Sequence, residues 1–413
     1  MAEPVNWDSQ KIVYITPCAM PLQFFTGLPT FLQARGFELH AVSSPERYLW
    51  DFCADEGCHA NPVPLSRSVT PLRDVASVVH LWRTLRRIRP AIVESHMSKA
   101  GLVGMMAAWL AGVPIRIYTN HGVAFSSATG WKRTVLKMLE QFSCRLASHV
   151  RCVSFSVCRL MVAEHCCKEQ KIRVLANGSC GLDAKERFNP NRVTPEVCQQ
   201  VRQLYGIPPD ALVLGFVGRI ATLKGIDDLT RAWQVLKQEH PNLHLLIVGG
   251  VDTRNPIHPQ TDALLRTDPR VHFSGEVVDT VPYYCAMNVQ VLPSFHEGLP
   301  ISLLEGAAMQ LPLVASRIPG NVEAVQDGVT GTLFPARDVS ALVEAISRYL
   351  KNPMLRRKHG LAGRMYVLPN FQREIVWEAC FQEYAKLLQQ AGMSTPQFAQ
   401  HSTSMIEQNR QAA

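Results

Sequence analysis

The sequence predicts an α/β fold made of two Rossmann-like, doubly wound domains that face each other across a cleft. Three observations predict it. The chain has 413 residues, more than one hydrophobic core usually supports. Short β-branched runs alternate with longer helical patterns, as parallel sheets covered by helices on both faces require. A polar stretch with four prolines, residues 183–209, separates two series of such runs and indicates a domain boundary.

The first series predicts a domain over residues 1–190. The apolar stretch Gly101–Val113 within it is shorter than the roughly 20 residues that a membrane-spanning helix needs, so we expect a buried helix there. The predicted strands are Lys11–Thr16, Glu38–Ser43, Ala91–His96, Ile115–Asn120 and His149–Ser154.

The second series predicts a domain over residues 191–370. We expect residues 371–391 to form a helix that packs back toward the first domain, and residues 392–413 to be a disordered polar tail. Sheets of this kind bind ligands beyond the carboxyl ends of their strands, so the cleft is the expected site. The predicted strands are Leu212–Gly218, Leu243–Gly249, Val271–Gly275, Val289–Ser294, Pro312–Ser316 and Gly331–Phe334.

Composition is that of a globular protein, with 47% hydrophobic and 18% charged residues. The first ten residues, MAEPVNWDSQ, lack the basic and apolar regions of a secretory signal, so we expect a cytoplasmic protein. The twelve cysteines contain no C-x2-C pair, which favours reduced, structural thiols over a metal site. Cys18 stands out only because it follows the first predicted strand.

The net charge of +8 resides in the first half. Residues 1–190 carry 22 Lys and Arg against 14 Asp and Glu, while the remainder is balanced. Either these are solvated helix faces, or they form a surface for anionic lipid headgroups or a diphosphate-bearing acceptor. Nucleic acid is not expected, because no binding module accompanies the charge. One predicted helix ends in Arg83, Arg86, Arg87 and Arg89, and another carries Lys132, Arg133, Lys137, Arg145 and Arg151 beside Trp131, Leu136, Leu139 and Phe142.

The turn GRIATLKG places Gly218 and Arg219 at a strand end and Lys224 just before a new helix. Two cations at a strand-to-helix turn suit a diphosphate, because the helix N-terminus adds its own partial positive charge. Such pairs also occur at ordinary turns, so the turn alone does not identify a site.

The segment after the strand Val289–Ser294 supports a diphosphate site at this turn. A loop presents Glu297 and Gly298, and Pro300 is expected at the first helical position. The free amides of residues 298–302 would then suit a phosphate. Glu305 would lie one turn inside the helix, so the two carboxylates could accept hydrogen bonds from different hydroxyls of one ligand.

The segment Phe295–Glu305 resembles the E-x7-E motif of retaining glycosyltransferases of family 4, which have the GT-B fold, and GRIATLKG resembles its usual upstream companion. The similarity covers nearly the whole chain. It implies that Glu297 contacts the transferred sugar and Glu305 the ribose of a nucleotide-sugar donor. The other donor-binding residues that it implies are Gly218, Arg219, Lys224, Gly249, Val277, Gly298, Leu299, Pro300 and Ile301.

The first half resembles the acceptor side of such enzymes. His121 in TNHGVAF matches the family's cleft histidine near the reacting sugar, although a lone histidine is more often structural. ESHMSKAGLVG resembles enzymes that build bacterial surface polysaccharides, and makes His96 and Ser98 acceptor-side candidates. The chain departs from the family in its first loop, where PCAMPLQFFTGLP replaces a double glycine.

The sequence contains no D-x-D triplet, the acid pair that commonly holds a divalent ion on a sugar nucleotide. We therefore expect neither metal nor cofactor. The resemblance implies retention of anomeric configuration, with a UDP-sugar as the expected donor and a glycan, lipid-linked in the finer hypothesis, as the acceptor. That acceptor would bring the protein to the cytoplasmic face of the inner membrane. A sugar-nucleotide epimerase and a non-catalytic sugar-nucleotide-binding protein remain as alternatives on the same fold.

Overall fold

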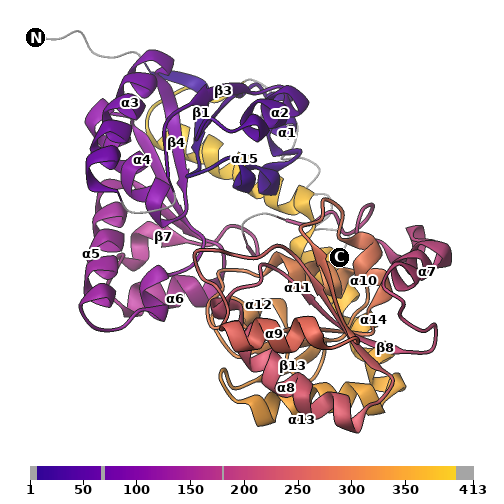
Figure 1. Cartoon of the computed structure of the whole chain (residues 1–413). Coiled ribbons are helices and arrows are strands. Elements are labelled where there is room, and N and C mark those ends of the chain that lie inside the picture. Colours follow the sequence, from indigo (N-terminus) through magenta and orange to yellow (C-terminus); the bar gives the residue numbers. More distant parts are fainter. Residues whose placement is uncertain (1–6, 67–69, 179–180, 397–413) are drawn as a thin grey trace, which may run out of the picture. The chain divides into compact units, whose positions relative to one another are not determined.

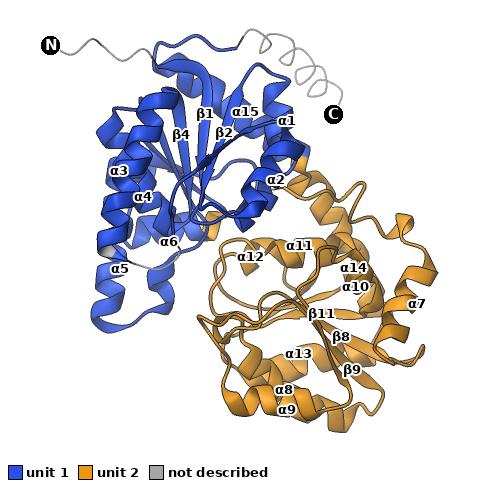
Figure 2. Cartoon of the chain, turned by 45° about the horizontal axis from the view of Figure 1, so that its top comes forward, with its two compact units in different colours: residues 1–153, 157–180, 374–413 blue, residues 154–156, 181–373 orange. Residues whose placement is uncertain are grey.

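The computed structural model describes residues 7–66, 70–178 and 181–396 (Figure 1). The predicted tail lies, beyond residue 396, outside the described residues, as do residues 1–6. The chain forms two compact units (Figure 2). Unit 1 comprises residues 1–153, 157–180 and 374–413, and unit 2 comprises residues 154–156 and 181–373.

Unit 1 contains a seven-stranded parallel sheet in the order β3-β2-β1-β4-β5-β6-β7. The five predicted strands are present, with ends that differ by at most three residues. Strands β3 and β7 were not predicted; both are short, and they lie at the two edges of the sheet. The strands are β1 (Asp8–Ile15), β2 (Glu38–Ser43), β3 (His59–Pro62), β4 (Pro90–His96), β5 (Ile115–Asn120), β6 (His149–Cys152) and β7 (Ile172–Arg173).

Each face of this sheet has its own core, because successive side chains of a strand point to opposite faces. Val13 and Ile15 belong to one core, and Ile12 and Tyr14 to the other, which also contains Phe381 of α15. The 3-10 helices are η1 (Met20–Phe25), η2 (Ala124–Ser127) and η3 (Glu169–Lys171). The α-helices are α1 (Leu28–Gln33), α2 (Arg47–Glu56), α3 (Pro71–Ile88), α4 (Ser98–Ala111), α5 (Gly130–Leu146), α6 (Phe155–Ala163) and α15 (Arg373–Gln390).

Helix α4 confirms the expected buried helix. Gly101 and Gly104 let it lie against the sheet, since an added Cβ would come within 2.2 Å of the Tyr118 ring and 2.1 Å of the Ser95 hydroxyl. The exposed large apolar residues of this helix are Trp109 and Leu110, both in its last turn. Among helices of the described residues, none is long and apolar enough to span a bilayer.

Unit 2 contains a six-stranded parallel sheet in the order β10-β9-β8-β11-β12-β13, around one hydrophobic core. All six predicted strands are present. They are β8 (Leu212–Val217), β9 (Leu243–Val248), β10 (Val271–Gly275), β11 (Val289–Leu292), β12 (Leu313–Ser316) and β13 (Gly331–Phe334). The helices are η4 (Pro190–Arg192), α7 (Pro195–Leu204), η5 (Thr222–Lys224), α8 (Ile226–Glu239), α9 (Pro259–Thr267), α10 (Val281–Ala286), α11 (Ile301–Ala308), α12 (Asn321–Ala324), α13 (Val339–Lys351) and α14 (Pro353–Phe371).

The strand order reverses between β1 and β4 in unit 1 and between β8 and β11 in unit 2. At such a switch point the loops after the two strands leave in opposite directions and open a crevice at the carboxyl edge of the sheet. The topology therefore places the turn after β8 and the loop after β11 side by side.

Two features of the sequence read differently in the structure. Arg151 was grouped with the basic helix, but it lies in β6, within the predicted strand His149–Ser154, and is buried. Cys198 of α7 and Cys285 of α10 form a disulfide that the cysteine spacing did not indicate, while the nine other described cysteines form no disulfide.

Candidate active site

Glycines bring the backbones after β8 and β9 into contact. Gly218 donates its amide to the carbonyl of Val248 at 2.9 Å. Gly249 has φ 139°, and an added Cβ would lie 2.1 Å from the carbonyl oxygen of Gly218. A side chain at Gly249 would therefore push the turn after β9 away from the turn after β8, which holds the predicted phosphate-binding residues Arg219 and Lys224.

Arg219 follows Gly218 and forms an ion pair with Asp252, which the sequence analysis did not identify. The Arg219 side chain is 54% exposed, whereas that of Asp252 is 7% exposed. Burial favours the neutral acid, but the amide of Arg254 and the guanidinium of Arg219 outweigh it and hold the pKa of Asp252 below its ordinary value. An ionised Asp252 thus orients an accessible guanidinium.

Lys224 and Glu297, which the sequence analysis assigned to different parts of the donor, contact each other. The Lys224 Nζ lies 2.5 Å from Glu297 Oε1, with both side chains largely buried. The two loops are fixed nearby, because the Phe295 amide donates to the Leu223 carbonyl at 2.9 Å. Gly225 permits this approach, since a Cβ added at this position would lie 2.0 Å from the carbonyl oxygen of Pro293.

Helix α11 begins one residue later than predicted, at Ile301, with Pro300 as its N-cap. The loop before α11 is fixed by contacts to the carbonyl oxygen of Gly298. Ser154 donates its hydroxyl to the Gly298 carbonyl at 2.8 Å, and an added Cβ on Gly320 would lie 2.5 Å from the same oxygen. The amides of Ile301 and Ser302, which helix geometry leaves without intrahelical acceptors, thus follow a fixed loop.

Glu305 lies in the second turn of α11 and accepts a hydrogen bond from the Tyr284 hydroxyl at 2.7 Å. Burial raises the pKa of Glu305 to about 7. Tyr284 comes from α10 and was not predicted. Val277, in the loop between β10 and α10, packs against the core of unit 2.

In unit 1 the structure brings His96 and His121 together. His96 is the last residue of β4, and His121 directly follows the neighbouring strand β5. His96 Nδ1 lies 3.1 Å from His121 Nε2. Burial lowers the pKa of His96 to about 4 and that of His121 to about 3. Both imidazoles are therefore neutral at pH 7, so that one donates to the other.

Beneath this pair lies a buried charged network. Glu94 Oε2 lies 2.7 Å from Arg151 Nη1, and Glu94 Oε1 accepts from Thr119 at 2.6 Å. The Tyr384 hydroxyl of α15 also donates to Glu94. Burial opposes ionisation of Glu94, but Arg151 and His96 lower its pKa below the ordinary value. A small pocket is lined by Tyr14, Phe25, Glu94, His96, His121 and Tyr384, among others.

Ser98 was predicted as an acceptor-side residue together with His96, but its hydrogen bonds are to other residues than those of His96. Its hydroxyl hydrogen-bonds to Glu140 and Tyr118. Asn120 joins them through its Nδ2, 2.7 Å from Glu140, and its Oδ1 accepts from the Gly122 amide at 2.8 Å. Ser98 therefore belongs to a group that supports the turn carrying His121.

The comparisons with known proteins agree with this arrangement. The family model "Glycosyl transferases group 1" matches residues 211–352, and "Glycosyl transferase 4-like domain" matches residues 28–178. A capsular polysaccharide biosynthesis glycosyltransferase of Staphylococcus aureus is 28% identical over 383 residues, 93% of this chain and 99% of that one. A UDP-Gal:α-D-GlcNAc-diphosphoundecaprenol α-1,3-galactosyltransferase of Escherichia coli is 28% identical, over 81% of this chain and 84% of its own.

Among solved structures, HepE of Anabaena in complex with UDP and glucose superimposes with a TM-score of 0.75 at 17% identity, over 91% of this chain and 99% of that one. The two parallel-sheet units have the GT-B fold of glycosyltransferases. The chain belongs to the family 4 type of these enzymes.

Proposed function

We propose that this glycosyltransferase moves a sugar, with retention of configuration and without a metal ion, from a UDP-sugar to a lipid-linked glycan acceptor in surface-polysaccharide biosynthesis. The observation that carries the proposal is the Lys224–Glu297 pair at the switch point between β8 and β11. The names of the S. aureus and E. coli relatives support the acceptor and pathway, and UDP in the Anabaena complex supports the donor.

The proposed donor site assigns separate duties to the charged groups of unit 2. Arg219, Lys224 and the first amides of α11 bind the diphosphate. Because Lys224 already pairs with Glu297, an arriving phosphate competes for the ammonium and leaves the carboxylate for the sugar hydroxyls. Glu305 accepts from the ribose. Gly218, Gly298, Leu299, Pro300 and Ile301 contribute backbone contacts, and the loops after Gly249 and Gly275, with Val277, flank the base.

The proposed chemistry is a front-face, oxocarbenium-like displacement. The bond from the anomeric carbon to the diphosphate oxygen breaks as the acceptor oxygen bonds to the same face, and the departing phosphate takes the acceptor proton. Arg219 and Lys224 stabilise the charge that develops on the leaving group. Neutral His121, oriented by His96, hydrogen-bonds to the reacting sugar. Glu297 is less suited to attack as a nucleophile, because its carboxylate is paired with Lys224.

Nucleotide release tests the proposal. We expect the full chain to release UDP from a UDP-sugar only when a diphospholipid-linked glycan is added, and to do so equally in excess EDTA. NMR of the product should show the anomeric configuration of the donor. Conversion of the donor without acceptor would indicate an epimerase, binding without turnover would indicate a binding protein, and strong inhibition by EDTA would contradict the metal-independent mechanism.

Donor affinity should depend on the ionisation of Glu305. With its pKa at about 7 in the free protein, an ionised carboxylate must be formed before it accepts the ribose hydroxyls. UDP binding should therefore weaken by about tenfold for each pH unit below 7 and level off above about pH 8. Calorimetric titration between pH 5.5 and 8.5 measures this. Glu305→Gln should bind weakly with a flat profile, whereas the same slope in that variant would assign the titration to another group.

Helix α5 offers a surface for anionic lipid. Trp131, Val135, Met138 and Phe142 are exposed at helical spacing and form one apolar stripe. Lys132 and Arg145 are exposed on the same helix. We expect co-sedimentation with phosphatidylglycerol vesicles at low salt that weakens at high salt and in Trp131→Ser/Met138→Ser. A matched Leu72→Ser/Val75→Ser variant of exposed α3 residues should bind normally, and absence of wild-type binding at either salt would contradict this surface.

A further inference from the structure

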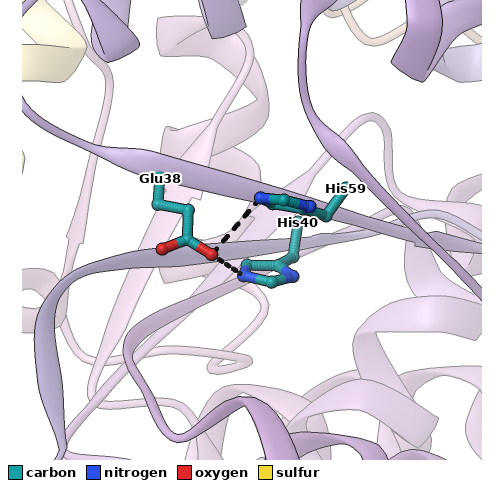
Figure 3. A group of neighbouring side chains, drawn as sticks. All are labelled: Glu38, His40 and His59. Atoms are coloured by element: carbon teal, nitrogen blue, oxygen red, sulfur yellow. Dashed lines mark hydrogen bonds and ion pairs between the residues drawn. The ribbon is translucent and has the colours of Figure 1, made fainter.

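We propose that unit 1 binds a borderline divalent transition-metal ion, with Zn²⁺ as the best match, through Glu38, His40 and His59. Figure 3 shows the three side chains turned toward one another on β2 and β3. His40 Nε2 lies 2.9 Å and His59 Nε2 lies 3.4 Å from the same oxygen, Glu38 Oε1. One ligand atom from each residue lies within 4.8 Å of the other two, and this is the only such group of three among the described residues.

The sheet itself assembles this group. Glu38 and His40 are two residues apart on β2, so their side chains leave the same face of the sheet. The parallel register pairs His40 with His59, which brings the third ligand beside them from the edge strand β3. The imidazole rings stack, with centroids 4.8 Å apart. Three ligands from two strands thus converge without any loop rearrangement.

The donor set and its surroundings suit Zn²⁺. Two imidazole nitrogens and one carboxylate oxygen form a recurrent zinc ligand set that leaves a position open. The Glu38 and His59 side chains are 41% and 59% exposed, so that position faces solvent. The Asn61 amide Nδ2 lies 3.3 Å from His40 Nδ1, and a flip of this amide would let its oxygen accept from the Nδ1–H of a metal-bound ring, as outer partners of metal-bound histidines do.

This site is separate from the proposed sugar-transfer site. Glu38 and His59 are the first residues of β2 and β3, whereas His96 and His121 lie at the opposite, carboxyl edge of the sheet. An ion here would tie β3, a four-residue edge strand, to β2. It would stabilise unit 1 without touching the reacting groups. Lys11 is in register with Glu38 on β1, and its charge opposes cation binding, but Lys11 is itself paired with Asp8 at 3.2 Å.

Metal titration of the full chain tests the site. After EDTA treatment and dialysis, calorimetry with ZnCl₂ should show one site per chain, and about 100-fold excess over Kd should raise the unfolding midpoint by roughly 5 °C. Co²⁺ should bind at the same site without the strong near-ultraviolet absorption of a cobalt–thiolate bond, which separates it from the cysteines. Nucleotide release should be unchanged by the metal.

Variants decide whether these residues are the ligands. Glu38→Gln and His59→Gln change exposed side chains that are not needed for folding, and each should weaken zinc binding by more than about tenfold, since even an outer partner is worth that much. The matched control is His272→Gln. His272 also pairs with a histidine of a neighbouring strand, His244, at 2.9 Å, but belongs to no three-ligand group among the described residues. Wild-type zinc affinity in His59→Gln and Glu38→Gln, or a cobalt–thiolate spectrum, would overturn the proposal.

Discussion

Replacing Glu297 by alanine is expected to lower kcat by about 10³-fold, the upper range for loss of one group that acts in the transition state. UDP binding should remain nearly unchanged. The carboxylate is proposed to hold the hydroxyls of the transferred sugar, where an oxocarbenium-like charge develops, and the nucleotide is held by other groups. The variant also releases Lys224 from its 2.5 Å ion pair, so the ammonium becomes available to phosphate.

The measurement that separates these effects is kcat from nucleotide release together with Kd for UDP by calorimetry. Loss of kcat with a retained or lowered Kd for UDP is the expected pair of results. Glu344→Ala removes an exposed glutamate of α13 in unit 2 and serves as the matched control, which should keep wild-type activity. Normal turnover by the Glu297→Ala variant would remove Glu297 from the site, and loss of UDP binding in that variant would assign it to the nucleotide.

The fold could be predicted from the sequence because most strands have a local apolar pattern that is typical of buried strands. The run LHLLIV in β9 is apolar except for one histidine and ends in two β-branched residues, as expected of a strand buried on both faces. By contrast, β3 has the sequence HANP, without a β-branched residue and with a proline, and is a strand only because β2 offers it an edge. No local pattern could have indicated it, and the same holds for the cluster that β3 completes with His59.

The residues of the candidate site that belong to motifs were predicted from the sequence, but the contacts between them were not. Lys224 and Glu297 are 73 residues apart, and their pairing depends on the adjacency of β8 and β11. Asp252 and Tyr284, which hold Arg219 and Glu305, lie in segments without a motif. These supporting groups follow from tertiary packing, which sequence spacing alone does not contain.

Arg151 was the clearest error, and the signal that would have corrected it was present. It lies in the predicted strand HVRCVS, between apolar residues, and Glu94 lies in the predicted strand AIVESH after three apolar residues. A charge inside a buried strand requires an opposite charge, so an acid in one central strand and a base in another predict each other. The structure places the two side chains 2.7 Å apart, with each about 5% exposed.

Replacing Arg151 by methionine is therefore expected to destabilise the protein by about 3–5 kcal/mol at pH 8, because it leaves Glu94 as an uncompensated buried charge. For a unit of this size the unfolding midpoint should fall by about 10 °C. Arg145→Met, on exposed α5, is the matched control and should leave the midpoint unchanged.

The loss should depend on pH with a definite sign. In the wild type, the pKa of Glu94 lies below its ordinary value, so the pair stabilises the fold above that ordinary value and loses its effect as the pH falls through the folded pKa. Without Arg151, burial dominates and raises the pKa of Glu94, so destabilisation grows as the pH rises above the ordinary glutamate range. Thermal unfolding of the variant should thus be closer to that of the wild type at pH 5 than at pH 8.

The double variant Glu94→Gln/Arg151→Met completes the cycle. It removes both charges and should recover much of the stability lost by Arg151→Met, while Thr119 and Tyr384 can still hydrogen-bond to the glutamine. Recovery of stability without recovery of kcat would show that the charged pair also positions His96, whose ring lies 3.8 Å from Glu94, and through it His121. Equal stability of Arg151→Met and Arg145→Met at pH 8 would refute the buried ion pair as a stabilising element.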